Sequence, residues 1–467
     1  MNIKKEVFLL SQKQQTSMLA KLFPVFGQQN VNMKTELLAG LTTFLTMAYI
    51  IAVNPSILSE TGMDAGALVT ATCLGAAVGC FLMGFVANLP FGLAPAMGLN
   101  AFFAFSVVLG MGIPWEVALT AVFCEGIIFI LLTICKVREA VVQAIPHNMK
   151  FAVTAGIGLF IAFIGLINGS IVVNDDATLV SLNQFALPGI ITCIGVLIIG
   201  ALDKRGVRGA ILIGILVCSC IGWGYALINP SAAAELGIFL PDGIMKFESI
   251  APIAGKIDFS YIFHPEHAST FIMVLLTFLF VDFFDTVGTL VGVCSKANML
   301  DKDGNVPNVS RALMADAVAT TAGAALGTST VTTFVESSTG VSAGGRTGYT
   351  AITIGVLFLV AMFFSPIFIA IPSCATAPAL IYVGYLMLGA AKNIEFDNIT
   401  EGLPAFITIA AMPLTYSIGD GLILGVLSYV LVNLLYNVMA PAEKRKKVSV
   451  VMIVLAILFI LKFWFGI

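Results

Sequence analysis

Long apolar runs alternate with short polar connections along almost the whole chain. Each run has about the 17–25 residues that an α-helix needs to cross the hydrocarbon core of a bilayer. The polar loop 229–269 divides the runs into two sets, and the apolar block 449–466 predicts either a further crossing or a helix at the membrane interface. The pattern predicts an all-α polytopic membrane protein with fourteen spans, at 36–54, 66–88, 90–110, 116–135, 149–167, 185–203, 208–228, 270–294, 310–327, 328–344, 346–371, 375–391, 401–418 and 419–437.

Composition agrees with a membrane protein. The 467 residues are 59% hydrophobic and 10% charged, with a mean hydropathy of +1.01, whereas soluble domains have about 25% charged residues. The first 35 residues are more polar and lack the apolar core of a signal peptide, so we expect a cytoplasmic N-terminus in an inner or plasma membrane.

Other compositional features exclude several classes of partner. The nine cysteines show no CxxC spacing, so we expect buried small side chains. His264 and His267 lie in a polar loop without a further ligand nearby, and we expect no metal site. A net charge of −3 offers no basic face for nucleic acid.

Lysine and arginine residues orient the spans, because cytoplasmic loops are enriched in them. The predicted external loops 54–65, 111–115 and 168–184 contain neither residue type. The long central loop carries Lys246 and Lys256, but long loops follow the rule poorly. An arrangement of seven plus seven spans places the following lysines and arginines in cytoplasmic loops, as the rule requires: Lys136, Arg138, Lys150, Lys204, Arg205, Arg208, Lys296, Lys302, Arg311, Arg346, Lys392 and 444–447.

The first and eighth spans resemble each other. Seven is an odd number, so the second half of the chain would enter the membrane upside down relative to the first. Inverted repeats of this kind are characteristic of secondary transporters, whose site lies near the midplane between the halves. Four positions match at a constant offset of 234 residues: Leu41, Thr43, Phe44 and Leu45 recur as Leu275, Thr277, Phe278 and Leu279.

The third span is interrupted by four helix-breaking residues. Pro90, Gly92, Pro95 and Gly98 precede a helical run that begins near Asn100. Proline removes a backbone donor and glycine weakens a helix, so we expect 90–98 to be extended.

The tenth span is interrupted at the equivalent place in the repeat. Its β-branched run at 328–335 predicts a short strand, with a helix starting near Glu336 and ending at the Gly344–Gly345–Arg346 turn. Two half-helix N-termini would then converge at mid-depth, each with unpaired N–H groups. Irregular backbone at that depth is tolerated where it lines protein or a cavity, so we expect a binding cavity here.

Three acidic residues stand out among those within the predicted spans. An ionised carboxylate at the bilayer centre costs about 2.5–3.5 kcal/mol on insertion scales. Asp282 and Asp285 share one helix face, Glu336 stands at a helix start, and none has a lysine or arginine near it in mid-span. We expect such groups to exchange a proton or to hold a ligand rich in N–H donors.

Structural roles remain open for these acids. The aspartate pair would also suit the holding of a neighbouring helix, and Glu336 would suit a helix cap. Glu125 and Asp316 suit packing or hydrogen bonding, and Asn100 suits either a cap or a binding role.

Four motifs together resemble the azaguanine-type purine permeases of the nucleobase–cation symporter-2 family. They are GLTTFLTMAYIIAVNP, GLAPAMGLNAFFAF, FVDFFDTVGTLVG and TTFVESSTGVSAGGRTG, and the resemblance covers almost the whole chain. It implies fourteen spans in two inverted seven-span repeats, and proton-coupled uptake of hypoxanthine, guanine or adenine. The implied divisions are a cytoplasmic segment (1–35), a core domain (36–135 and 270–371), a gate domain (149–228 and 375–437) and an additional C-terminal helix (449–466).

The resemblance also assigns residues by position. Asp285 and Glu336 fall on the acidic substrate residues, with Asp282 one turn before the former, and these three are the implied proton-coupling groups. The uracil and xanthine branch has glutamate at the position of Asp285, and uracil carriers have histidine at Thr289, so the proton route of that branch does not transfer. The remaining implied substrate-site residues are Asn100, Thr46, Phe334 and Ser337, with Phe102 and Phe103 as further aromatic candidates to flank the purine.

The resemblance implies no cofactor. The coupling ion is a proton, with Na⁺ the less favoured choice, and a homodimer through the gate domain is compatible with the family.

Two other classes of protein are alternatives to a purine permease. A sulfate- or bicarbonate-type anion carrier of the same architecture should present a cation or bare helix N-termini, which three midplane carboxylates oppose. An intramembrane aspartyl protease needs a carboxylate on each of two helices, whereas Asp282 and Asp285 share one helix. We therefore expect a transporter without catalytic residues.

Overall fold

The protein is described by a computed structural model that covers residues 24–27, 31–135, 146–184, 186–296, 299, 306–439, 441 and 445–465. Most of the predicted cytoplasmic segment 1–35 lies outside these residues, as do Lys136, Arg138, Lys302 and Lys444. The orientation that these residues predict therefore stays a prediction.

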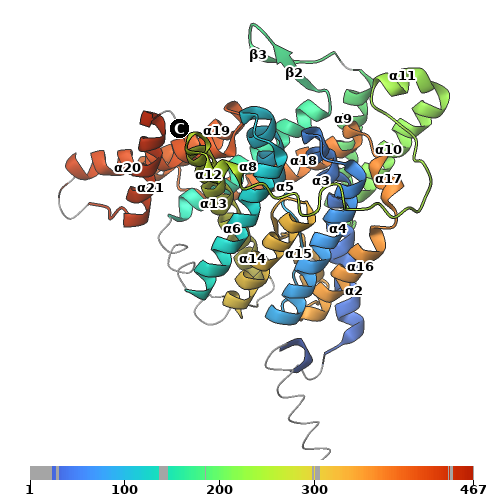
Figure 1. Ribbon diagram of the computed structural model, residues 1–467, viewed down its shortest axis with the longest axis horizontal. Helices are drawn as coiled ribbons and strands as arrows, with labels where there is room; N and C mark the ends of the chain where they lie inside the picture. The colour runs from blue at the N-terminus through green and yellow to red at the C-terminus, as the bar shows by residue number, and fades with distance from the viewer. Residues whose placement is uncertain are drawn as a thin grey trace, which may run out of the picture.

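The first half of the chain is helical apart from one short extended segment and one hairpin (Figure 1). Its elements are α2 (Met33–Met47), α3 (Ile50–Leu58), α4 (Ala65–Leu82), the π-helical η3 (Met83–Ala87), β1 (Leu93–Pro95), α5 (Met97–Ala101), the π-helical η4 (Phe102–Gly110), α6 (Trp115–Ile134), α8 (His147–Asn168), β2 (Val172–Asp175), β3 (Leu179–Leu182), α9 (Leu187–Lys204) and α10 (Ala210–Ile228).

The second half of the chain is also mostly helical, with one short strand, and it follows two short linking helices. The linking helices and the elements that follow are α11 (Pro230–Glu235), α12 (Ser260–Phe263), α13 (Pro265–Lys296), α14 (Val309–Leu326), β4 (Val331–Thr333), α15 (Ser337–Ser342), α16 (Gly348–Ala361), α17 (Ser365–Ile369), α18 (Ser373–Leu388), α19 (Ile399–Leu414), α20 (Ile418–Met439) and α21 (Val450–Phe465).

The all-α membrane fold is confirmed. Among the described residues, nine helices are long and apolar enough to cross a membrane. Three of the other predicted spans correspond to shorter apolar helices, at Met97–Gly110, Gly348–Ala361 and Ile399–Leu414. The number fourteen stays a prediction.

Several boundaries differ from the sequence prediction, and two of the differences have a clear local cause. Helix α13 begins at Pro265, five residues before the predicted 270, because proline at the first helical position has its backbone angle already fixed for a helix. The helix of the third span begins at Met97, three residues before Asn100 and two residues after Pro95, the last of the prolines.

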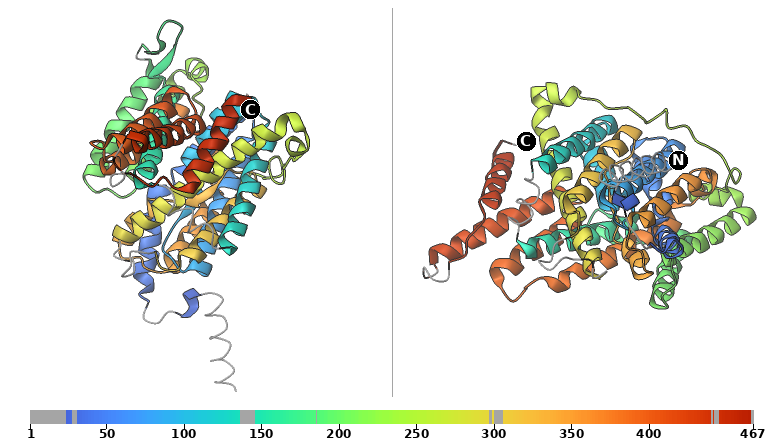
Figure 2. Two further views of the ribbon diagram at one scale, coloured as in Figure 1. Left: turned by 90° about the vertical axis from the view of Figure 1, so that its left-hand side faces the viewer. Right: turned by 90° about the horizontal axis from the view of Figure 1, so that it is seen from below.

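Helices from opposite halves of the chain pack into two groups. Helices α2 and α4 pack on α16, and α6 packs on α14. Helices α8, α9 and α10 pack on α18, and α8 also packs on α19. Figure 2 shows the second group as green and orange-red helices side by side, next to the blue, cyan and gold helices of the first group.

Close approach of α8 and α18 depends on two glycines. A methyl group added at Gly384 would collide with the carbonyl of Gly158, and one added at Gly158 would collide with that of Gly384. Small residues let helix backbones approach within a membrane, where packing and not hydrophobic burial drives association.

The central loop is fastened to the first group of helices. Ser365 donates to the carbonyl of Lys246 at 2.7 Å, and Thr70 donates to the carbonyl of Glu248 at 2.8 Å. Farther along, the Gly255 amide donates to the carbonyl of Ala325 at 2.8 Å. The loop therefore follows the ends of α4, α14 and α17.

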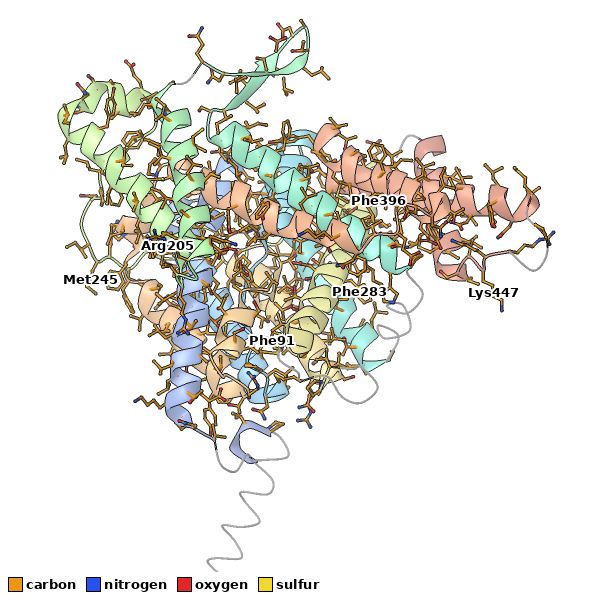
Figure 3. All side chains as sticks on the ribbon, turned by 180° about the vertical axis from the view of Figure 1, so that it is seen from behind. Phe91, Arg205, Met245, Phe283, Phe396 and Lys447 are labelled. Carbon is orange, nitrogen blue, oxygen red and sulfur yellow. The ribbon has the colours of Figure 1, made fainter. Side chains whose placement is uncertain are left out.

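The C-terminal helix α21 is joined to α19 and α20 by a polar connection, at the edge of the molecule near Lys447 (Figure 3). Asn437 and Lys446 exchange two hydrogen bonds of 2.7 and 2.8 Å. The Lys446 ammonium donates to Thr400 Oγ1 at 2.7 Å and lies 3.3 Å from a Glu401 carboxylate oxygen. The apolar face of α21, formed by Met452, Leu455 and Phe459, helps to close an apolar hollow against α8, α13 and α20.

Candidate functional site

The two interrupted spans meet as a buried pair of extended segments. Strands β1 and β4 run antiparallel, with Leu93 opposite Thr333 and Pro95 opposite Val331. The amide of Ala96 donates to the carbonyl of Thr330, and that of Phe334 donates to the carbonyl of Gly92, both at 3.0 Å. The predicted extended stretches are confirmed, and the backbone groups freed from helix are hydrogen-bonded across the pair.

The side chains of residues 328–333, which we call the hydroxyl segment, connect this strand pair to the surrounding helices. Asn54 of α3 donates to Thr328 at 3.0 Å, and Ser329 donates to the Asn100 side-chain oxygen. Thr330 donates to Glu125 at 3.1 Å. All of these side chains are buried, so the segment supplies polar partners inside the protein that the bilayer cannot supply.

Asp282 lies in a buried acid cluster with Thr286, Asp316 and Thr332. The Thr286 hydroxyl is 3.2 Å from Asp282 Oδ1, 3.0 Å from Asp316 Oδ2 and 2.6 Å from Thr332 Oγ1. Thr332 donates to Asp316 Oδ1 at 3.0 Å. All four residues have no exposed surface. The cluster ties α13 to α14 and β4, which is the helix-holding role that the sequence left open for Asp282.

Asp285 and Glu336 differ from the buried acid cluster because solvent can reach their side chains. Both side chains are partly exposed, and the carboxyl group of Asp285 is close enough to those of Glu336 and Asp316 for electrostatic repulsion. Within the described part of the chain, neither forms an ion pair with a lysine or arginine. Asp285 belongs to the eighth span and Glu336 to the tenth. A ligand bound next to both residues would contact two carboxylates.

Glu336 is held by a tyrosine that the sequence analysis did not single out. The Tyr49 hydroxyl donates to Glu336 Oε1 at 2.7 Å. One turn earlier on the same span, Thr46 Oγ1 lies 3.0 Å from Thr339 Oγ1, and Thr339 also reaches the backbone carbonyl of Glu336 at 2.7 Å. The first span and the start of α15 therefore meet at two points, three residues apart on each side.

At the start of α15, one open alternative is excluded and one expectation is wrong. Glu336 precedes the helix but makes no side-chain cap bond. The first amides of the helix, those of Ser337, Ser338 and Thr339, donate to the carbonyls three residues before them, so the tight turn leaves none of these N–H groups free for a ligand. Helix α15 is six residues long, too short for a large dipole.

The other predicted site residues lie in or beside this framework. Asn100 is fully buried, and nothing among the described residues accepts its side-chain N–H₂ group. The Ser337 hydroxyl accepts from the Gly92 amide at 3.0 Å. Thr46 donates within its own helix at 2.7 Å. Phe334 is 7% exposed at the end of β4. Their substrate-binding role stays a prediction.

The additional aromatic candidates have packing roles. Phe102 and Phe103 are buried, with ring centroids 4.9 and 6.4 Å from that of Phe278. This packing fixes η4 against α13 close to the acidic residues.

Two hollows in the described structure lie away from Asp285 and Glu336. One is the apolar hollow beneath α21, and the other is a polar one near the ends of α8, α9 and α18, which includes Asn168, Glu235 and Ser373. Within the described residues, no group of three or more His, Cys, Asp or Glu side chains has a geometry that could hold a metal ion.

Comparisons with known proteins place the chain among permeases. Residues 34–422 match the permease family. A putative permease of Methanocaldococcus jannaschii is 46% identical over 94% of this chain and 96% of its own length. The adenine permease AdeQ of Escherichia coli is 41% identical over 95% and 96%, and the guanine/hypoxanthine permease PbuO of Bacillus subtilis is 42% identical over 93% and 98%.

Solved structures give the fold alone. The transmembrane domain of the cyanobacterial bicarbonate transporter BicA superposes with a TM-score of 0.65 at 15% identity, over 85% of this chain and 98% of that domain. The likeness agrees with the predicted inverted-repeat architecture and, at this identity, carries no statement about substrate.

Proposed function

This multi-pass membrane protein belongs to the permease family, in its azaguanine-type purine branch, and from that premise we propose that it takes up purine nucleobases by proton symport. The names of the relatives support adenine, guanine and hypoxanthine as the substrates to test first. The observation that carries the proposal is the pair of partly exposed carboxylates, Asp285 and Glu336, beside the β1–β4 crossing.

The chemistry of a purine suits these groups. A purine is planar and uncharged, and its edges alternate N–H donors with ring-nitrogen or carbonyl acceptors. Ionised carboxylates are acceptors only, and each has about four lone-pair positions. Tyr49 occupies one position on Glu336, which leaves the others for the N–H groups of a base.

Proton coupling rests on the repulsion within the site. Asp285 has Asp316 and Glu336 as its electrostatic neighbours, and like charges in a low-dielectric setting resist simultaneous ionisation. A proton taken up by one of Asp282, Asp285 or Glu336 relieves that repulsion, and its release after transport restores it. Such an arrangement needs no Na⁺ and no cofactor.

Alternating access would use the two groups of helices. We assign α2–α6 and α13–α17 to the core domain and α8–α10 and α18–α20 to the gate domain, with a cytoplasmic N-terminus in the plasma membrane. Movement of one group against the other would open the acidic site to each side in turn. A homodimer would form through the gate domain.

Two other functions fit less well. An anion would be repelled by Asp285 and Glu336, so the likeness to an anion transporter extends to the fold alone. A protease would need two reachable aspartates on separate helices; Asp282 and Asp316 lie on separate helices but have no exposed surface.

Uptake into proteoliposomes tests the proposal. Labelled adenine, guanine and hypoxanthine should accumulate when the lumen is alkaline, should not respond to Na⁺, and should stop when the pH gradient is dissipated. Asp285→Asn and Glu336→Gln should each abolish uptake while the protein stays folded. Wild-type uptake by either variant would remove that residue from the site, and uptake of sulfate without purine uptake would favour the anion carrier.

A further inference from the structure

Tyr49 lies at an irregular turn in the otherwise helical first span. Helix α2 ends at Met47 and α3 begins at Ile50, so Ala48 and Tyr49 form a turn between them. The Tyr49 side chain is 1% exposed, and its hydroxyl reaches a carboxylate that lies 287 positions away in the sequence. This bond therefore joins the first span to the start of α15.

We propose that Tyr49 is a positioning residue that holds the Glu336 carboxylate as a hydrogen-bond acceptor for the purine. The proposal rests on the proposed function, because Glu336 must meet the substrate for its orientation to matter. It adds a residue that the family resemblance did not assign.

The chemistry of the pair gives Tyr49 this role. A buried phenol hydroxyl needs a hydrogen-bond partner, and an isolated phenol keeps its proton at neutral pH. It therefore donates to Glu336 throughout the physiological range. A donor on one carboxylate oxygen favours the ionised form of the acid, which is the form that accepts from a purine N–H group on its remaining lone pairs.

A second contact fixes the direction of the carboxylate. Thr46 and Thr339 meet at 3.0 Å, one turn from the Tyr49–Glu336 pair on both helices. Two contacts three residues apart prevent α15 from rotating relative to the first span. Rotation of α15 would otherwise swing Glu336 away from Asp285.

The charged surroundings of the pair are acidic. Besides Glu336, Asp285 of α13 acts electrostatically on Tyr49, and Asp316 of α14 acts on Asp285 in turn. In this setting a phenol hydroxyl is the neutral donor that offsets repulsion without adding a positive charge. Tyr49→Phe removes the donor and keeps the ring.

The structure offers a matched control in Tyr382. Its hydroxyl donates to Asp203 Oδ2, also at 2.7 Å, but this pair joins α18 to α9 away from the β1–β4 crossing. Tyr382→Phe therefore shows how the loss of a tyrosine–carboxylate hydrogen bond away from the site affects transport.

Transport assays with purified protein in proteoliposomes should distinguish a positioning role of Tyr49 from a purely structural one. We expect Tyr49→Phe to raise the KM for adenine or hypoxanthine by about tenfold, the loss of one charge-assisted hydrogen bond, with a smaller change in maximal rate. The pH dependence of KM should move to higher pH, because the carboxylate without its donor keeps its charge less well. Tyr382→Phe should change neither quantity.

A double-mutant cycle keeps the proposal falsifiable if Tyr49→Phe folds poorly. Glu336→Asp shortens the acid and should raise KM by itself; in that background Tyr49→Phe should add little, because the contact is already lost. Additive effects, or a Tyr49→Phe variant with wild-type KM and pH dependence, would overturn the proposal. If the wild-type protein takes up no purine, the proposed function fails; if the wild type transports purines and Glu336→Gln is inactive while Tyr49→Phe is normal, this inference alone fails.

Discussion

Ser106 of η4 donates a hydrogen bond of 3.1 Å to the backbone carbonyl of Tyr416, in the turn between α19 and α20. Tyr416 has a positive φ of 54°, and its ring packs edge-on against Phe105, Phe160 and Phe163. This contact joins the span that follows β1 to the helices we assign to the gate domain. Transport by relative movement of the two groups would have to break it.

Ser106→Ala should therefore change the rate of transport more than substrate affinity. Loss of the bond costs about 1 kcal/mol, which alters the balance between conformations about fivefold. We expect a changed maximal rate of purine uptake with an unchanged KM. Ser428→Ala is the control, because Ser428 of α20 bonds only within its own helix; an equal effect of both variants would contradict a role at the interface.

Thr286→Val should destabilise the protein through the buried acid cluster. The hydroxyl contacts Asp282, Asp316 and Thr332, and loss of a buried hydrogen bond to a charged group costs about 1–3 kcal/mol. We expect a clear fall in the midpoint of thermal unfolding in detergent, with recovery in Thr286→Ser. Thr154→Val is the control, since Thr154 donates only to Lys150 of its own helix. Equal stability of the valine and serine variants at position 286 would show that the bridging hydroxyl is dispensable.

Removal of residues 449–467 should leave a folded transporter. The face of α21 that packs on the protein is apolar, and the side chains beneath it, including Met149, Leu422 and Val426, are apolar as well. Lipid solvates such a surface about as well as another helix does. We therefore expect purine uptake by the truncated protein to stay within about twofold of wild type. Uptake should be normalised to the amount of folded protein, measured as the main peak in gel filtration. Loss of the folded peak would show that α21 is an integral part of the fold.

The β2–β3 hairpin should show a pH dependence set by Asp175. Hydrogen bonds from the Thr178 backbone, the Thr178 hydroxyl and the Ala177 backbone lower the pKa of Asp175. A lowered folded-state pKa means that the acid stabilises the loop above its unfolded pKa, about 3.9, and ceases to do so as pH falls through the folded value. Asp175→Ala should speed proteolysis of the hairpin at pH 7 and have a smaller effect at pH 2. A difference of equal size at both values would refute the linkage.

The sequence predicted the interruptions of the fold because their causes are local. Proline at 90 and 95 and the β-branched run at 328–335 act on their own backbone, and both stretches are extended in the structure. The spans follow from apolar length for the same reason. The start of α15 was misjudged because its amides bond to the carbonyls three residues before them, a detail of turn geometry that residue type does not determine.

Side-chain pairings between distant parts of the chain could not be predicted from the sequence. Tyr49 meets Glu336, and Glu36 accepts from the Arg346 and Thr347 amides at 3.1 and 3.3 Å; both pairs join residues hundreds of positions apart. A weak signal existed for Tyr49, a polar hydroxyl one turn after Thr46 in an apolar run. Its partner could be identified only once the tenth span was folded against the first.

The hydroxyl segment has a consequence for how this chain can change over evolutionary time. Thr328, Ser329 and Thr330 bond to three different helices, α3, α5 and α6, and Thr332 bonds to α13 and α14. A substitution at one position would disturb only the partners of that side chain. Insertion or deletion of a single residue would send every later side chain toward the wrong neighbour, so lineages that vary freely in loop length should keep this stretch at constant length.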